Sequence, residues 1–187
     1  MSSEYLQITA FCAYLGSWLA LAITAVVAAI PRRRRQATTS VAMTAPVIAG
    51  TVLQGVSALP ITLFLKDGPL RPRVFELVGT LALAPLAAVL FGWAIWSLRS
   101  EADAKTVITG GAYACVRHPM YLAFFAMLLA TGLLASAGAT LVASIVLYVV
   151  GSELRIASEE AELEETFPAD YAQYRLKTRW RYLPGLR

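Results

Sequence analysis

The stretch GGAYACVRHPMY, residues 110–121, stands where a polar loop gives way to a long apolar run, and it holds the single histidine of the chain. Pro119 suits the first turn of a helix, because its missing backbone N–H would have no helical partner there in any case. Arg117 and His118 therefore lie at the mouth of a helix. If that helix crosses a membrane, both side chains sit at the boundary with water.

The composition is that of a membrane protein. Of 187 residues, 58% are hydrophobic and 15% are charged, whereas soluble domains carry about 25% charged residues. Apolar runs recur along the whole length and leave no room for a soluble domain of ordinary size, so we predict one membrane-embedded domain over residues 1–187. Cys12 and Cys115 lie far apart and form no metal-binding pattern.

We predict an all-α fold with about five transmembrane helices. Three spans occupy residues 1–98, and a helical hairpin follows the motif loop. The first run is too long for a cleaved signal peptide, and no positive charge precedes it. Prolines are expected to interrupt the second and third spans, at Pro46, Pro60 and Pro85. The apolar runs cover residues 6–30, 41–65, 74–98, 120–135 and 140–151.

The last two runs are short, since about 16 helical residues measure only ~24 Å. They must borrow length from their flanks or form a shallow hairpin. After Gly151 the sequence turns polar and is typical of a helix that leaves the membrane. Phe167-Pro168 is expected to end that helix, a second short helix is expected over residues 170–177, and a basic aromatic tail closes the chain.

The distribution of positive charge predicts the orientation. Arg32 to Arg35 most simply form a topology anchor, although such a run could also bind nucleic acid or anionic lipid. With five spans, this loop, the motif loop and the C-terminus share one side and hold most of the sixteen Lys and Arg. The positive-inside rule places that side in the cytosol and the N-terminus outside.

Two polar segments are expected to meet on the cytosolic face, because the hairpin between them brings its own ends together. They offer a cation pair, a carboxylate pair and several tyrosines. Cations could hold a carboxylate, acids an ammonium group or ribose hydroxyls, and aromatic faces a purine or a sulfonium. S-adenosylmethionine combines these parts. The residues are Arg117, His118, Glu159, Glu160, Tyr113, Tyr121, Tyr171 and Tyr174.

Each feature alone has an ordinary structural explanation. The cations could be interface anchors, Arg155 and Glu159 an i,i+4 pair on a wet helix face, and the tyrosines an aromatic belt. The combination is more specific. Arg-His-Pro-x-Tyr, an apolar hairpin and Arg-x3-Glu-Glu-x6-Phe-x3-Tyr-x2-Tyr resemble the isoprenylcysteine carboxyl methyltransferase family and the related phospholipid N-methyltransferases. The matching residues are Arg117, His118, Pro119, Tyr121, Arg155, Glu159, Glu160, Phe167, Tyr171 and Tyr174, with Thr178, Arg181 and Pro184 in the tail.

The resemblance covers residues 110–184. Two positions depart from the family pattern: Ala112 replaces the proline of Gly-Pro-Tyr, and Pro168 replaces the glycine of Phe-Gly. The first three spans match only as apolar helices.

The resemblance implies a membrane enzyme that binds S-adenosylmethionine on its cytosolic side and releases S-adenosylhomocysteine. The C-terminal tail would act as a lid, and a lipophilic or prenylated acceptor would enter from the bilayer. Arg155 would orient a carboxylate acceptor, whereas an amine acceptor would need a base, for which Glu160 is the candidate. The expected cofactor-binding residues are Tyr113, Arg117, His118, Pro119, Tyr121, Glu159 and Glu160.

Several functional interpretations remain open from the sequence. O-methylation of a lipophilic carboxylate is the leading one, and N-methylation of a lipid amine such as phosphatidylethanolamine is the second. A membrane reductase of the steroid-reductase type, with NADPH as cofactor, is the third, and a non-catalytic membrane protein is the fourth. A prokaryotic inner membrane is the expected location, with membrane lipid but no nucleic acid among the partners. The sequence does not determine the oligomeric state.

Overall fold

A computed structural model of the chain describes residues 3–29, 44–63, 72–101, 106–135, 137–183 and 185. All regular structure in these residues is helical, which confirms the predicted fold class. The elements are α1 Ser3–Ala29, α2 Ala45–Val56, α3 Leu59–Leu63, α4 Val74–Ser100, the 3-10 helix η1 Gly111–Ala114, α5 Pro119–Leu134, α6 Gly138–Thr166 and α7 Pro168–Lys177.

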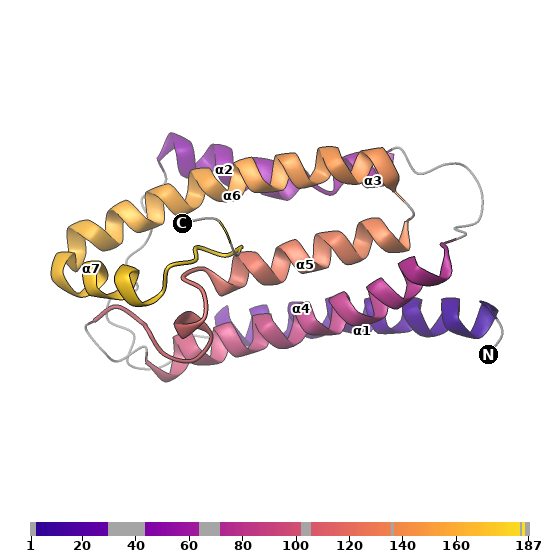
Figure 1. Cartoon of the computed structure of the whole chain (residues 1–187), viewed down its shortest axis with the longest axis horizontal. Coiled ribbons are helices and arrows are strands. Elements are labelled where there is room, and N and C mark those ends of the chain that lie inside the picture. Colours follow the sequence, from indigo (N-terminus) through magenta and orange to yellow (C-terminus); the bar gives the residue numbers. More distant parts are fainter. Residues whose placement is uncertain are drawn as a thin grey trace.

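The helices run back and forth along one axis. As a result, η1, the start of α5 and α7 lie together at one end, opposite the N-terminus (Figure 1). Four helical stretches are long and apolar enough to cross a membrane, and α5 is a shorter apolar helix. Together with α5, they are roughly compatible with the prediction of about five passes. The long stretches are Glu4–Val27, Ala45–Leu63, Val74–Ser100 and Gly138–Thr166.

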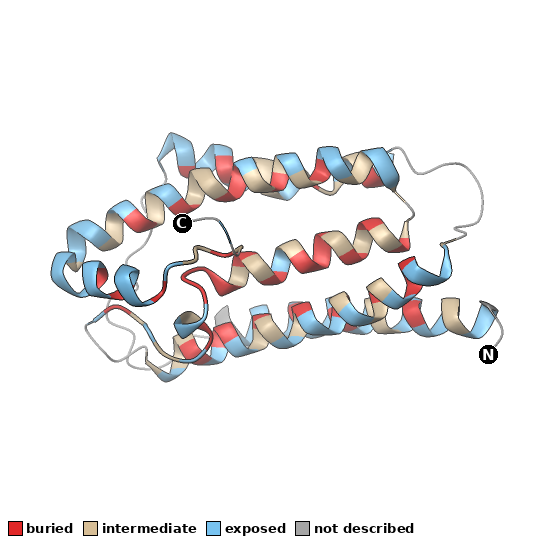
Figure 2. Ribbon diagram, viewed as in Figure 1, coloured by how far each residue is buried: buried red, intermediate tan, exposed pale blue. Residues whose placement is uncertain are grey.

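The helices bury the faces that they turn toward one another (Figure 2). α4 packs along both α1 and α5, and α6 packs along α2. Large apolar side chains remain on the outer faces, among them Val89 on α4, which is 68% exposed, and Trp96, which is 72% exposed. Exposed apolar surface on this scale is unfavourable in water and suits contact with lipid.

Two of the three prolines that were predicted to interrupt a span do not interrupt a helix. α4 continues unbroken through Pro85, and Pro46 stands in the first turn of α2 rather than interrupting a helix. A membrane helix accommodates an internal proline when neighbouring helices hold the turns on either side, and α4 has such neighbours in α1 and α5. The second span does break, at residues 57–58, just before Pro60. Residues 41–43 and 64–65 of that predicted span lie outside the described residues.

α6 joins the predicted fifth span and the polar helix that follows it into one continuous helix of 29 residues. No proline interrupts it, and Gly151 and Ser152 are buried within it. At 1.5 Å per residue the helix measures ~43 Å, so it gains length from its polar C-terminal flank. The predicted stop is confirmed: α6 ends at Thr166, and α7 begins at Pro168.

Two glycines allow α2 and α6 to cross closely. A Cβ at Gly50 would lie 2.6 Å from the carbonyl oxygen of Gly151, and a Cβ at Gly151 would lie 2.8 Å from that of Gly50. Small residues at such crossings are the usual means by which membrane helices approach each other. This crossing brings the polar side chains of α2 next to the C-terminal half of α6.

Gly50→Ala is expected to lower the free energy of unfolding by about 1–3 kcal/mol, because the new methyl group meets backbone and cannot be accommodated by a rotamer change. The thermal midpoint of the detergent-solubilised protein measures the effect. Gly55→Ala is the matched control on the same helix, since a Cβ there meets nothing within 4 Å. Equal midpoints for the two variants would contradict the close crossing.

Candidate active site

The motif loop is fastened to α4 before it enters α5. Gly111 has a φ of +58°, and a Cβ there would lie 2.1 Å from the Ser97 hydroxyl oxygen. That oxygen accepts a hydrogen bond from the backbone N–H of Ala112 at 3.1 Å. Gly111 therefore permits the motif loop to pass close to α4. Pro119 is the first residue of α5, as expected, and His118 caps that helix.

The C-terminal tail runs alongside the motif. The backbone N–H groups of Arg117 and His118 donate to the carbonyl oxygens of Trp180 and Arg181, at 2.9 and 2.7 Å. The Arg117 guanidinium also donates through Nη1 to the carbonyl oxygens of Thr178 and Arg179, both at 2.9 Å. Arg117 thus anchors the tail, a role that the sequence did not predict.

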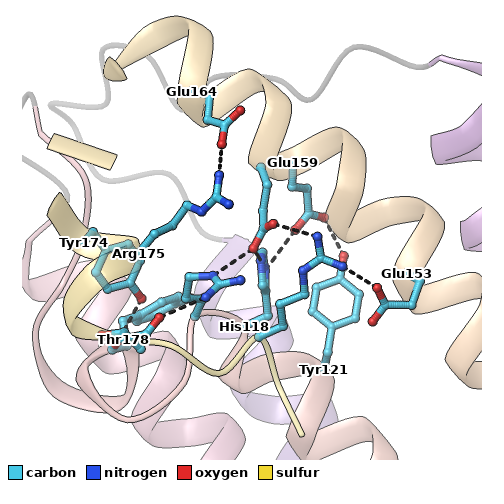
Figure 3. A network of polar contacts seen from close by, with 12 residues as sticks. His118, Tyr121, Glu153, Glu159, Glu164, Tyr174, Arg175 and Thr178 are labelled. Carbon is cyan, nitrogen blue, oxygen red and sulfur yellow. Dashed lines mark hydrogen bonds and ion pairs between the residues drawn. The ribbon is translucent and has the colours of Figure 1, made fainter. Parts of the chain in front are cut away.

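Glu160 is the centre of a buried charge network. Its Oε1 accepts from Arg117 Nε at 2.9 Å and lies 3.3 Å from His118 Nε2, while its Oε2 lies 3.1 Å from Arg181 Nη2. Arg181 also pairs with Glu153, about two turns before Glu160 on α6, at 2.5 Å. Figure 3 shows side chains from the motif, α6 and the tail converging on this point. The carboxylate therefore faces three cationic side chains.

Glu159 binds the other face of the histidine. Its Oε2 lies 3.5 Å from His118 Nδ1, and its Oε1 accepts from the Tyr121 hydroxyl at 2.5 Å and from Arg155 Nη2 at 3.3 Å. The His118 ring also meets the Tyr121 ring edge-on, with centroids 5.6 Å apart. Both ring nitrogens of His118 therefore face a carboxylate, which suits an imidazolium with two N–H donors.

The electrostatics agree with that protonation state. Burial alone would lower the pKa of His118, but hydrogen bonds and charge from Glu159 and Glu160 outweigh it, and the pKa is raised above its ordinary value. Tyr113 lies nearby, where burial and the charge of Glu159 raise the pKa of its hydroxyl to about 12. The raised pKa of His118 favours the cationic form of its ring, and Tyr113 is neutral at neutral pH.

Arg155 is held from two sides, through its Nη1 and Nη2 atoms. Its Nη1 donates to Gln54 Oε1 at 3.1 Å, its Nη2 faces Glu159, and its Cζ lies 5.5 Å from the centroid of the Tyr121 ring. Its Nε is buried and has no hydrogen-bond partner among the described residues. A buried donor of this kind is costly unless a further acceptor binds it.

Most predicted site residues meet in this network: Arg117, His118, Tyr121, Arg155, Glu159 and Glu160. Tyr113 lies in an adjacent aromatic cluster, where its backbone carbonyl accepts from the Tyr174 hydroxyl at 2.7 Å. Gln54 was not among the predicted site residues. A polar amide inside an otherwise apolar run is itself a signal of function in membrane proteins, and Gln54 carries that signal.

Residues 80–165 match the model of the isoprenylcysteine carboxyl methyltransferase (ICMT) family. Over this segment the chain is similar to that family. The segment contains α5, the motif up to His118 and the Glu159–Glu160 pair, and the predicted resemblance is confirmed over it. The tail and α2 lie outside the segment that matches the family.

A curated relative is similar over a shorter length. The Protein-S-isoprenylcysteine O-methyltransferase of Schizosaccharomyces pombe is 46% identical over 72 residues, which are 38% of this chain. The matched residues span 30% of the length of that relative.

Proposed function

We propose that this protein methylates the carboxylate of a lipophilic acceptor, most simply a prenylated cysteine, with S-adenosylmethionine as the methyl donor. The observation that carries the proposal is the convergence of His118 with Glu159 and Glu160 at the water-side mouth of α5. These groups come from segments about forty residues apart in sequence. The match of residues 80–165 to the model of a methyltransferase family supports the proposal.

The residues present fit the donor. S-adenosylmethionine supplies an electrophilic methyl group and carries a carboxylate, an ammonium group and a purine. The buried Nε atom of Arg181 has no partner among the described residues, so the network retains a hydrogen-bond donor for an anionic group of this molecule. Glu159, His118 and Tyr121 would bind the amino-acid end, and Tyr113 and Pro119 would shape the site beside it. Arg117 and Glu160 would hold the tail over it.

The charge balance favours O-methylation over N-methylation. An acceptor carboxylate is already ionised at neutral pH and needs orientation but no base. An amine acceptor must lose a proton, and Glu160 was the candidate base. Its three cationic neighbours stabilise the carboxylate and make proton abstraction by it unfavourable. We therefore assign Glu160 to binding and retain Arg155 as the residue that orients the acceptor.

We also infer that the site faces the cytosol and the N-terminus lies outside, in a prokaryotic inner membrane. The positive-inside rule supports this orientation, because the Arg32–Arg35 loop, the motif loop and the segment after the hairpin together hold thirteen of the sixteen Lys and Arg. A lipophilic acceptor reaches such a site from the bilayer, while the charged donor reaches it from water.

The detergent-solubilised protein should transfer a labelled methyl group from S-adenosylmethionine to N-acetyl-S-farnesylcysteine. The same acceptor as its methyl ester is the matched control, since it keeps the lipid chain but offers no carboxylate, and we expect no label on it. The measurement is radioactivity in the extracted acceptor.

Two other outcomes would contradict the assignment. Label on phosphatidylethanolamine and none on the prenylcysteine would identify an N-methyltransferase. Tight binding of NADPH with no binding of S-adenosylhomocysteine would favour a reductase.

A further inference from the structure

Gln54 stands in an apolar helix that precedes the family segment, yet it contacts the proposed site. It lies on α2, one turn after Gly50, and the glycine crossing brings it against α6. Its Nε2 donates to the hydroxyl of Ser152 at 2.8 Å, and its Oε1 accepts from Arg155 Nη1 at 3.1 Å. A polar amide within a membrane helix is costly and usually serves a function.

The orientation of the amide follows from its partners. Arg155 can only donate, so the amide oxygen must face it, and the amide nitrogen must then face Ser152, whose hydroxyl can accept. Ser152 is fully buried. Gln54 is thus fixed on one side by a buried hydroxyl and holds one arm of the guanidinium on the other.

The contacts of Arg155 leave one direction open. Gln54 engages Nη1, Glu159 engages Nη2, and the Tyr121 ring lies 5.5 Å from the Cζ atom. Nε is the third nitrogen of the guanidinium, and it has no hydrogen-bond partner among the described residues. The position of Nε depends on how the other two nitrogens are held, because the guanidinium is a rigid plane.

We propose that Gln54 is a positioning residue that orients Arg155 toward the carboxylate of the acceptor. It thereby makes α2 part of the acceptor site. The inference rests on the proposed function. The alternative is a purely structural role, in which the hydrogen bonds of Gln54 only stabilise the packing of α2 on α6, as polar residues often do between membrane helices.

The test is the kinetics of Gln54→Leu with N-acetyl-S-farnesylcysteine as acceptor. Loss of one hydrogen bond to a charged group predicts a rise of about tenfold or more in the acceptor KM. The KM for S-adenosylmethionine and the affinity for S-adenosylhomocysteine should stay within about twofold, because Gln54 contacts no group assigned to the donor. Thr51→Val is the matched control, since among the described residues the Thr51 hydroxyl donates only to the Val47 carbonyl of its own helix.

Ser152→Ala tests which of the two hydrogen bonds of Gln54 matters for the acceptor. It removes the bond to Ser152 but keeps the amide oxygen facing Arg155. Positioning predicts that Ser152→Ala lowers the thermal midpoint but raises the acceptor KM less than Gln54→Leu does. Equal rises in KM for the two variants would overturn the proposal.

A double-mutant cycle tests the route through Arg155. In an Arg155→Lys background, Gln54→Leu should add less than about twofold to the acceptor KM, because the group that it positions is already gone. Additive effects would overturn the proposal. If Gln54→Leu fails to bind S-adenosylhomocysteine, Gln54→Glu replaces it. Its added charge should compete with the acceptor for Arg155, so the same selective rise in KM is expected.

Different results would contradict the proposed function and the positioning role of Gln54. A parent protein that neither binds S-adenosylhomocysteine nor methylates the prenylcysteine overturns the proposed function, and the role of Gln54 with it. An active parent whose Gln54 variants match it in acceptor KM overturns only the positioning role.

Discussion

Replacing Glu160 with alanine is expected to lower the free energy of unfolding by about 3–5 kcal/mol and to abolish measurable binding of S-adenosylhomocysteine. The carboxylate faces Arg117, His118 and Arg181 within 2.9 to 3.3 Å, and its side chain is only 7% exposed. Removing one member of a buried ion network leaves the opposite charges buried without compensation, which is strongly destabilising. The loss should appear as a lower thermal midpoint in detergent.

The effect on the tail gives a second readout. Arg117 binds both Glu160 and the carbonyl oxygens of Thr178 and Arg179, so its side chain should lose its fixed position in the variant. We expect faster limited proteolysis after residue 177 in Glu160→Ala than in the parent. Glu160→Gln keeps the shape and part of the hydrogen bonding, and its midpoint should fall between the two.

Glu164 provides the matched control on the same helix. It pairs with Arg175, but both side chains are about half exposed, at 52% and 49%. Exposed ion pairs contribute less than about 1 kcal/mol, because water and salt screen them. Glu164→Ala should therefore leave the midpoint and the affinity nearly unchanged. If it destabilised the protein as much as Glu160→Ala, the buried network would not be the cause.

The parts of this arrangement that were predictable are those that depend on local sequence. Apolar runs predicted the positions of the membrane helices, Phe167-Pro168 predicted the end of α6, and Pro119 predicted the start of α5. The meeting of His118 with Glu159 and Glu160 was predictable as well, because an antiparallel hairpin must return its chain to the same side.

The parts that were missed depend on tertiary contacts. The local sequence around Pro85 does not predict that α4 continues through this residue, because the continuity of the helix is supported by its packing on α1 and α5. The sequence also gives no reason for α2 to lie along α6, which is what brings Gln54 to Arg155. The hydrogen bonds of Arg117 to the tail depend on the path of the tail, which the sequence did not predict, while its predicted contact with the cofactor stays a prediction.

Replacing His118 is expected to have the second large effect, and one that depends on pH. Both ring nitrogens face carboxylates, and hydrogen bonds to charged groups contribute about 1.5–3 kcal/mol each, so His118→Ala should lower the free energy of unfolding by about 3 kcal/mol at pH 6. The affinity for S-adenosylhomocysteine should fall about tenfold or more, since Glu159 and Glu160 lose the cation between them.

The sign of the pH dependence follows from the direction of the shift. The pKa of His118 in the folded protein is raised above its unfolded value of about 6.5. The stabilisation is therefore complete below about pH 6.5 and is lost as the pH rises through the folded pKa. We expect the difference in thermal midpoint between the parent and His118→Gln to be largest near about pH 6 and to shrink steadily toward alkaline pH.

The comparison with His118→Gln isolates the histidine from the other groups that titrate. Glutamine keeps a hydrogen-bonding side chain of similar length but carries no charge at any pH, while Glu159 and Glu160 are present in both proteins. A difference that stays constant with pH would mean that His118 is neutral in the folded state and contributes only packing. A difference that grows with pH would mean that burial outweighs the two carboxylates, so that the folded protein binds a proton at His118 less readily than the unfolded chain does.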